Sequence, residues 1–144
     1  YQDLGLPLLA DRPPGVGPLG GLAALLHAAD GADVVALACD MPFVTTDFVK
    51  KLIDADLADA DAIVAQTAPT AKLESFLARY RPSVLPVIEQ RLTEGERSLQ
   101  RILHGLRTRT LLIPPDEQTV CRDWDKIEEL PSELVAKLMR RDVT

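Results

Sequence analysis

The sequence predicts an α/β fold of three layers, with helices on both faces of a mostly parallel sheet. Short apolar runs alternate along the 144 residues with stretches of helical periodicity, which is the order of elements in α/β layer folds. The run 34–38 reads Val-Val-Ala-Leu-Ala, without charge or alternation, as is typical of a parallel strand buried on both faces. Apolar residues make up 47% of the chain, which is enough to form the core of one domain.

The individual elements follow from apolar runs and from the residues that stop or cap them. The predicted strands are 6–10, 34–39, 62–65, 76–80 and 108–113. The predicted helices run from near 20 to 29, from the Thr-Thr-Asp cap at 45–47 onward, over 83–92, over 98–103 and over 132–139. Gly31 is placed to end the first helix, and Phe48, Leu52 and Ile53 are expected on one side of the second.

Charge and cysteine usage exclude several classes of function. The net charge of −6, with no basic run longer than Arg140-Arg141, argues against a nucleic-acid partner, because binding to a phosphate backbone relies on clustered Lys and Arg. The apolar run 34–39 is far too short to span a bilayer, and no signal peptide is recognisable. Cys39 and Cys121 form no CxxC pair, and Cys39 is expected to be a buried small hydrophobe. These features predict a cytoplasmic protein without a nucleic-acid or membrane partner.

Asp40 is the first candidate functional residue, because it follows directly on the predicted strand 34–39. Pro42 prevents the strand from continuing. In open α/β sheets, ligands gather outside the carboxyl ends of the strands, and a carboxylate there is well placed to hold Mg²⁺ beside phosphates. The alternative is that Asp40 merely caps the next turn.

The stretch Gly-Pro-Leu-Gly-Gly-Leu at 17–22 opens a predicted helix after a loop rich in Pro and Gly. Glycines let the backbone approach a ligand closely, and the free amides of a first helical turn attract anions. The alternative is that these glycines only end the loop and begin the helix, without binding a ligand. Asp11 lies within reach of the same loop, where its carboxylate can accept from a base or a ribose hydroxyl, or simply form a turn.

Taken in order, these motifs resemble the molybdenum cofactor guanylyltransferases, which have the nucleotide-diphosphosugar transferase-like fold. The resemblance rests on the glycine motif at 17–22 and on Cys-Asp-Met-Pro-Phe at 39–43. It continues through Phe-Leu-Ala-Arg-Tyr-Arg at 76–81 and Gly-Glu-Arg-Ser-Leu at 95–99. It implies that the strand 76–80 runs antiparallel to its neighbours.

The resemblance also implies a reaction. The terminal phosphate of molybdopterin attacks the α-phosphate of GTP, and pyrophosphate is released. By this resemblance Asp40 is the catalytic Mg²⁺ ligand, and the residues that contact the nucleotide are Asp11, Gly17, Pro18, Leu19 and Gly21. The glycine motif favours guanine over cytosine. The implied partners are GTP and molybdopterin, with molybdoenzymes or other proteins of cofactor biosynthesis as further candidates.

The chain departs from the family pattern near both ends. The family begins with a strand and a Gly-rich phosphate loop followed by a Lys, and this sequence contains no such loop. Residues 1–144 are therefore expected to form a single nucleotidyltransferase-like domain that corresponds to the C-terminal two-thirds of a full one. By itself such a chain is expected to bind GTP weakly and to transfer no guanylyl group. Near the C-terminus, Asp125 stands where the family carries an Asn and is a second candidate Mg²⁺ ligand.

Two other functions remain open from the sequence. The first is a related nucleotidyltransferase that uses CTP or a sugar phosphate. The second is a non-catalytic binding module of the same fold. Thermal stabilisation by added nucleotide shows which nucleotide the protein binds and so distinguishes the candidate transferases, because a ligand that binds only the folded state raises its stability.

Overall fold

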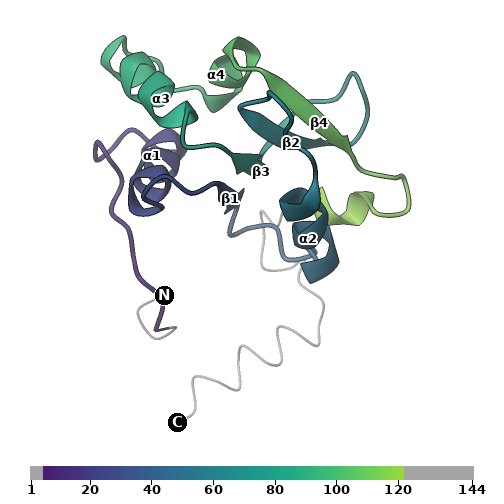
Figure 1. The fold of residues 1–144 in the computed structure, drawn as a ribbon. Coiled ribbons are helices and arrows are strands. Elements are labelled where there is room, and N and C mark those ends of the chain that lie inside the picture. Colours follow the sequence, from purple (N-terminus) through teal and green to yellow (C-terminus); the bar gives the residue numbers. More distant parts are fainter. Residues whose placement is uncertain (1–4, 122–144) are drawn as a thin grey trace.

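The computed structural model describes residues 5–121, which form a sheet flanked by helices (Figure 1). The elements, in chain order, are α1 (Pro18–Ala28), β1 (Val34–Leu37), α2 (Thr46–Asp54), β2 (Ala62–Gln66), β3 (Glu74–Tyr80), α3 (Val84–Thr93), α4 (Leu99–Gly105), β4 (Thr108–Leu112) and the 3₁₀ helix η2 (Gln118–Cys121). These bounds confirm the predicted elements between residues 20 and 113, each end to within two residues. The predicted helix 132–139 lies outside the described residues.

The four strands form one mixed sheet in the order β1-β3-β2-β4. β3 pairs antiparallel with both β1 and β2, and β2 pairs parallel with β4. β1, β2 and β4 therefore share one direction, and β3 alone runs against them, as expected for the strand 76–80. The predicted α/β class is confirmed, although β3 separates two of the parallel strands and leaves β2–β4 as the parallel pair among the described residues.

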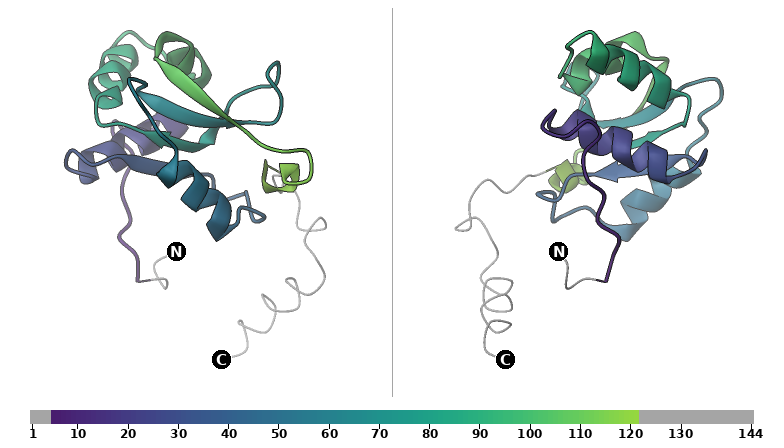
Figure 2. Two further views of the ribbon diagram at one scale, coloured as in Figure 1. Left: turned by 45° about the vertical axis from the view of Figure 1, so that its right-hand side comes forward. Right: turned by 90° about the vertical axis from the view of Figure 1, so that its left-hand side faces the viewer.

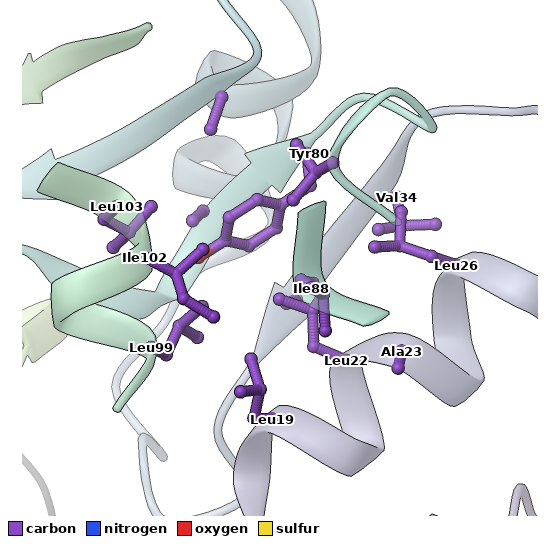
Figure 3. Packing of buried hydrophobic residues seen from close by; sticks show 14 of the residues in the cluster. Leu19, Leu22, Ala23, Leu26, Val34, Tyr80, Ile88, Leu99, Ile102 and Leu103 are labelled. Atoms are coloured by element: carbon purple, nitrogen blue, oxygen red, sulfur yellow. The ribbon is translucent and has the colours of Figure 1, made fainter. Parts of the chain in front are cut away.

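Two apolar clusters cover the two faces of this sheet and make it the middle layer of three. Side chains of α1, α3 and α4 pack on one face (Figure 3), and α2 and η2 pack on the other (Figure 2). Strand side chains alternate between the clusters: Ala62 and Val64 join the first, and Ile63 and Ala65 join the second. All of β2 is buried, because it lies inside the sheet with a layer on each side. Among residues 5–121, no helix combines the length and the apolar character of a membrane span.

The predicted strand 6–10 is wrong. These residues are irregular and exposed, with Leu6 67% and Leu8 59% accessible. A strand needs a neighbour for its ladder of hydrogen bonds, and the described sheet begins at β1 without pairing to this segment. The segment therefore has the apolar pattern of a strand, but no strand within the described residues pairs with it. Pro7 also removes one donor from any such ladder.

A polar clamp joins β2 and β4 at their amino ends. The Asp61 carboxylate accepts hydrogen bonds from Arg107 Nε at 3.1 Å, from an Arg107 terminal nitrogen at 2.9 Å and from Ser83 Oγ at 3.2 Å. The main-chain N–H of Asp61 donates to the Arg107 carbonyl at 2.7 Å. The side-chain hydrogen bond to Arg107 is the largest cause that lowers the pKa of Asp61 below its ordinary value of 3.8.

This clamp predicts a pH dependence of stability. A carboxyl group whose pKa is lower in the folded state stabilises the fold above its unfolded pKa, and that contribution is lost as the pH falls through the folded value. Asp61→Asn is therefore expected to lower the free energy of unfolding by a constant amount above about pH 5 and by less as the pH falls below 4. Urea unfolding at several pH values measures this, with the exposed Asp54→Asn as control. A difference that stays constant into acid would show that the charge of Asp61 does not stabilise the clamp.

Candidate functional site

The glycine motif lies at the start of α1, where its first residue adopts a conformation that requires glycine. Gly17 is the N-cap residue with φ 71° and ψ −153°, a region that L-residues with a side chain essentially avoid. Pro18 occupies the first helical turn, and Gly17 supplies no side-chain cap for the amides of that turn. The turn also contains no acidic residue. This helix start therefore presents backbone amides and a favourable dipole end to an anion.

Asp11 packs against the same helix start, as its place in the sequence suggested. The main-chain N–H of Arg12 donates to the Gly20 carbonyl at 3.1 Å, which closes the loop over α1. A Cβ built at Gly21 would lie 3.5 Å from Asp11 Oδ1, and one at Gly20 would lie 3.2 Å from Asp11 Cβ. The structure thus brings Asp11, Gly17, Pro18, Leu19 and Gly21 together. Leu19 is 0% exposed and packs in the core.

Gly20, in the first turn of α1, is the residue of this site that the sequence did not single out. A Cβ there would lie 2.7 Å from Val16 Cγ2 and 2.9 Å from the Pro13 carbonyl oxygen, closer than such atoms can approach. The close packing of loop 11–17 on α1 depends on this glycine. The pair Gly20-Gly21 was a visible signal, but the sequence does not tell which glycine faces the loop.

We expect opposite effects from alanine at these two neighbouring glycines. Gly20→Ala should destabilise the protein, because the clash with Val16 and Pro13 outweighs a helix-propensity gain of up to about 1 kcal/mol. Gly21→Ala meets only an ordinary contact at 3.5 Å and should stabilise by up to about that amount. Urea unfolding of both variants measures the two signs. Stabilisation by both would show that the loop is not packed on α1 as described.

Asp40 follows the carboxyl end of β1, in an exposed turn three residues after Leu37. Within residues 5–121 no hydrogen bond or ion pair engages its carboxylate, so it does not cap the turn in the described part of the chain. α2, the helix that follows, is instead capped by Thr45, whose Oγ1 accepts from the Phe48 amide at 3.2 Å. The described contacts therefore do not support the alternative that Asp40 merely caps the next turn.

The glycine motif and Asp40 lie at the same edge of the sheet. Leu26, near the end of α1, packs beside Val34 at the beginning of β1 (Figure 3). α1 therefore runs back along β1, and its N-terminus lies toward the carboxyl end of that strand. The carboxyl ends of β2 and β4 lie at this edge too, because those strands share the direction of β1. Ligands of open α/β sheets bind at such an edge.

The residues at this edge suit one kind of metal ion. No group of three or more His, Cys, Asp and Glu side chains among the described residues can hold a metal by itself, so this part of the chain contains no closed protein-only centre. Mg²⁺ is often bound by one or two carboxylates together with phosphate oxygens and water, and the exposed, unpaired Asp40 fits that pattern. Asp125, the second predicted ligand, lies outside the described residues.

The expectation for Cys39 was wrong, because its thiol is exposed. The strand ends at Leu37, two residues earlier than the predicted boundary, and Cys39 already belongs to the turn that carries Asp40. An apolar stretch in the sequence does not reveal at which residue the chain leaves the sheet. Cys39 is therefore a neighbour of the candidate site and not a part of the core.

Comparison with known proteins gives a family and several relatives. Residues 1–110 match the family described as "MobA-like NTP transferase domain". The chain is 33% identical over 123 residues to a protein of Peptoclostridium acidaminophilum named "Probable molybdenum cofactor guanylyltransferase", covering 81% of this chain and 54% of the relative. It is 41% identical over 88 residues to a "Molybdenum cofactor guanylyltransferase" of Pseudomonas putida, covering 60% and 44%. The chain thus spans about half the length of the curated relatives it matches.

Two solved structures share the fold. The molybdopterin-guanine dinucleotide biosynthesis protein A of Archaeoglobus fulgidus superposes with a TM-score of 0.70 at 22% identity, over 91% of this chain and 67% of that one. A putative protein of Aquifex aeolicus superposes with a TM-score of 0.77 at 21% identity, over 88% and 65%. The family match covers most of the residues that build the sheet and the candidate site. The chain therefore belongs to the MobA-like NTP transferase domain family.

Proposed function

We propose that this chain is part of a guanylyltransferase of molybdenum cofactor biosynthesis, which transfers GMP from GTP to molybdopterin. The observation that carries the proposal is the pairing at one sheet edge of a glycine-built helix start with the unpaired carboxylate of Asp40. The start of α1 can hold a nucleotide through backbone contacts. The carboxylate of Asp40 can hold a cation beside the phosphates of that nucleotide. The names of the curated relatives support the same reaction.

In this reaction an oxygen of the terminal phosphate of molybdopterin bonds to the α-phosphorus of GTP. The bond from that phosphorus to the bridging oxygen breaks, and pyrophosphate leaves with the electron pair. Mg²⁺, when bound, supplies positive charge at the phosphates. The role of Asp40 is to hold that ion at the carboxyl end of β1. The roles of Asp11 and of the Gly17–Pro18–Leu19 backbone are to hold and orient the guanosine part, because such transfer depends mainly on positioning and on charge stabilisation.

The test uses an enzyme that carries all family segments, the phosphate loop included. When it is incubated with GTP, Mg²⁺ and molybdopterin, the dinucleotide product and pyrophosphate should appear in equal amounts. CTP in place of GTP is expected to give much less product, because the glycine motif resembles that of the guanylyltransferases more than that of their cytidylyl relatives. Transfer from CTP at the higher rate would identify a cytidylyl enzyme. Binding of GTP without transfer, in an enzyme that carries all family segments, would identify a binding module.

A further inference from the structure

The strand β3 departs from regular pairing near the carboxyl end of β1. On the side of β1, the pairing is regular along the whole of that strand. On the other side, Val64 of β2 pairs with Ala78, and the next residue, Ala65, pairs with Glu74. While β2 advances by one residue, β3 passes from 78 to 74, so residues 75–77 form a bulge. Bulges are common next to active sites, where they redirect the chain or end the pairing.

The hydroxyl of Tyr80 holds this bulge from within the core. It donates to the Ser75 carbonyl at 2.6 Å. Tyr80 is 0% exposed, and its ring packs among side chains of α1, α3 and α4 (Figure 3). Five residues of regular strand span about 16 Å, which is beyond the reach of a tyrosine side chain, so the hydrogen bond depends on the bulge. Burial raises the pKa of Tyr80, and its hydroxyl therefore remains a donor at neutral pH.

Ser75, at the start of the bulge, is held at both of its backbone polar groups. Its amide donates to the Leu73 carbonyl at 3.0 Å, and that carbonyl also accepts from Gln100 Nε2 at 2.6 Å. The carbonyl of Ser75, which accepts from Tyr80, belongs to the peptide unit that leads into Phe76. Because a peptide unit is planar, fixing its oxygen also fixes the direction in which the chain enters Phe76.

Phe76 is in turn bonded to the turn that carries Asp40. Its carbonyl accepts from the Ala38 amide at 2.9 Å, directly beyond the last paired residue of β1. The Ala38 carbonyl accepts from the Met41 amide at 3.4 Å, which closes a turn with Asp40 at its third position. A continuous series of hydrogen bonds and peptide units therefore connects the Tyr80 hydroxyl with this turn.

The position of the Asp40 side chain depends on this turn. Within residues 5–121 no hydrogen bond or ion pair engages its carboxylate, so the described side chains give it no support. A metal ligand must be held to within about 0.5 Å of its productive position. The backbone of the turn has to provide that precision, and the bulge of β3 is what the first residue of the turn is bonded to.

We propose that Tyr80 is a positioning residue for Asp40: its hydroxyl fixes the bulge of β3, and the bulge fixes the turn from which the carboxylate of Asp40 holds Mg²⁺. This inference rests on the proposed function. Tyr80 is buried and acts only through the bulge. The alternative is that the hydroxyl merely satisfies a buried polar group and stabilises the core.

Tyr80→Phe tests the proposal, because it removes the hydroxyl and keeps the ring, so that the fold should be retained. The variant is made in an enzyme that carries all family segments, and hydrogen exchange is followed by NMR without substrates. The Ala38 amide should exchange about tenfold faster, the factor that corresponds to one net hydrogen bond. Amides between β2 and β4 should keep their rates. An unchanged Ala38 amide, or equal acceleration throughout the sheet, would overturn the proposal.

Thr108→Val is the matched control. It also removes a hydroxyl that donates to a backbone carbonyl, that of Leu103 at 3.2 Å, but it does so at the amino end of β4, at the opposite edge of the sheet from Asp40. Valine has nearly the same shape as threonine. This variant should leave both the exchange of the Ala38 amide and the Mg²⁺ dependence of transfer unchanged.

The Mg²⁺ dependence of guanylyl transfer gives the second readout. Tyr80→Phe should raise the Mg²⁺ concentration for half-maximal rate about tenfold, as is typical when a group that orients a metal ligand is lost, and should change kcat at saturating Mg²⁺ little. A loss of folded enzyme would instead lower the rate equally at every Mg²⁺ concentration. In an Asp40→Asn background, Tyr80→Phe should have no further effect, because the residue through which it acts is gone. A full additional effect there would overturn the proposal.

The two readouts separate this inference from the proposed function. If no variant and no wild-type enzyme transfers a guanylyl group while the Ala38 amide responds as expected, the proposed function fails and the coupling of Tyr80 to the turn stands. If transfer proceeds and its Mg²⁺ dependence is the same with phenylalanine at position 80, the proposed function stands and the positioning role of Tyr80 is wrong.

Discussion

In an enzyme that carries all family segments, replacing Asp40 with asparagine is expected to lower Mg²⁺-dependent guanylyl transfer by about a hundredfold or more, while the protein remains folded. The loss of one well-placed charge-stabilising group in an active site typically costs this much in rate. Asparagine has nearly the same size but carries no charge, so it holds Mg²⁺ more weakly. The fold should be unaffected, since Asp40 is exposed and its carboxylate makes no described hydrogen bond.

The measurement is the rate of dinucleotide formation as a function of Mg²⁺ concentration. The deficit should be largest at limiting Mg²⁺ and should shrink as the concentration rises, because the defect is in holding the ion. Asp54→Asn removes the same charge from an exposed position at the end of α2 and should transfer at the normal rate. A turnover of the Asp40 variant equal to that of the wild type at limiting Mg²⁺ would show that Asp40 is only a turn residue.

The second large effect is expected in the core beneath α2. Phe48→Ala should lower the free energy of unfolding by about 3–5 kcal/mol, the usual cost of removing a buried aromatic ring. Phe48 is 2% exposed and packs with Leu52 and Leu77 in the cluster on the α2 face of the sheet. A loss of this size is a large share of the stability of an ordinary domain, about 5–15 kcal/mol. Partial unfolding at moderate temperature is therefore expected.

Ile53→Ala on the same helix is the matched control. Its side chain is 51% exposed, and alanine favours the helix, so the change in stability should stay within about 0.5 kcal/mol. Urea unfolding of both variants, with the slope compared as well as the midpoint, gives the two values. Equal losses at Phe48 and Ile53 would mean that α2 presents a different face to the sheet.

Several features of the fold were determined by local sequence. Thr45 and Ser98 each accept a hydrogen bond from an amide three residues later and begin α2 and α4, because a short side-chain oxygen at the N-cap satisfies a donor that the helix leaves open. The uncharged run 62–65 became the buried strand β2. The family resemblance, which also comes from the sequence alone, predicted the reversed direction of β3.

The tertiary structure decided what depends on neighbours that are distant in the sequence. Residues 6–10 have a strand-like pattern but no described strand to pair with, and Ile53 shares the apolar character of Phe48 but faces away from the sheet. Cys39 leaves the strand and becomes exposed, and Gly20 rather than Gly21 takes the close contact with loop 11–17. The sequence by itself thus determined the kind and the approximate bounds of the elements between residues 20 and 113, and it pointed to the motifs that carry the candidate site. Which face of an element is buried depended on packing between segments that are distant in the sequence, and no local pattern encodes that packing.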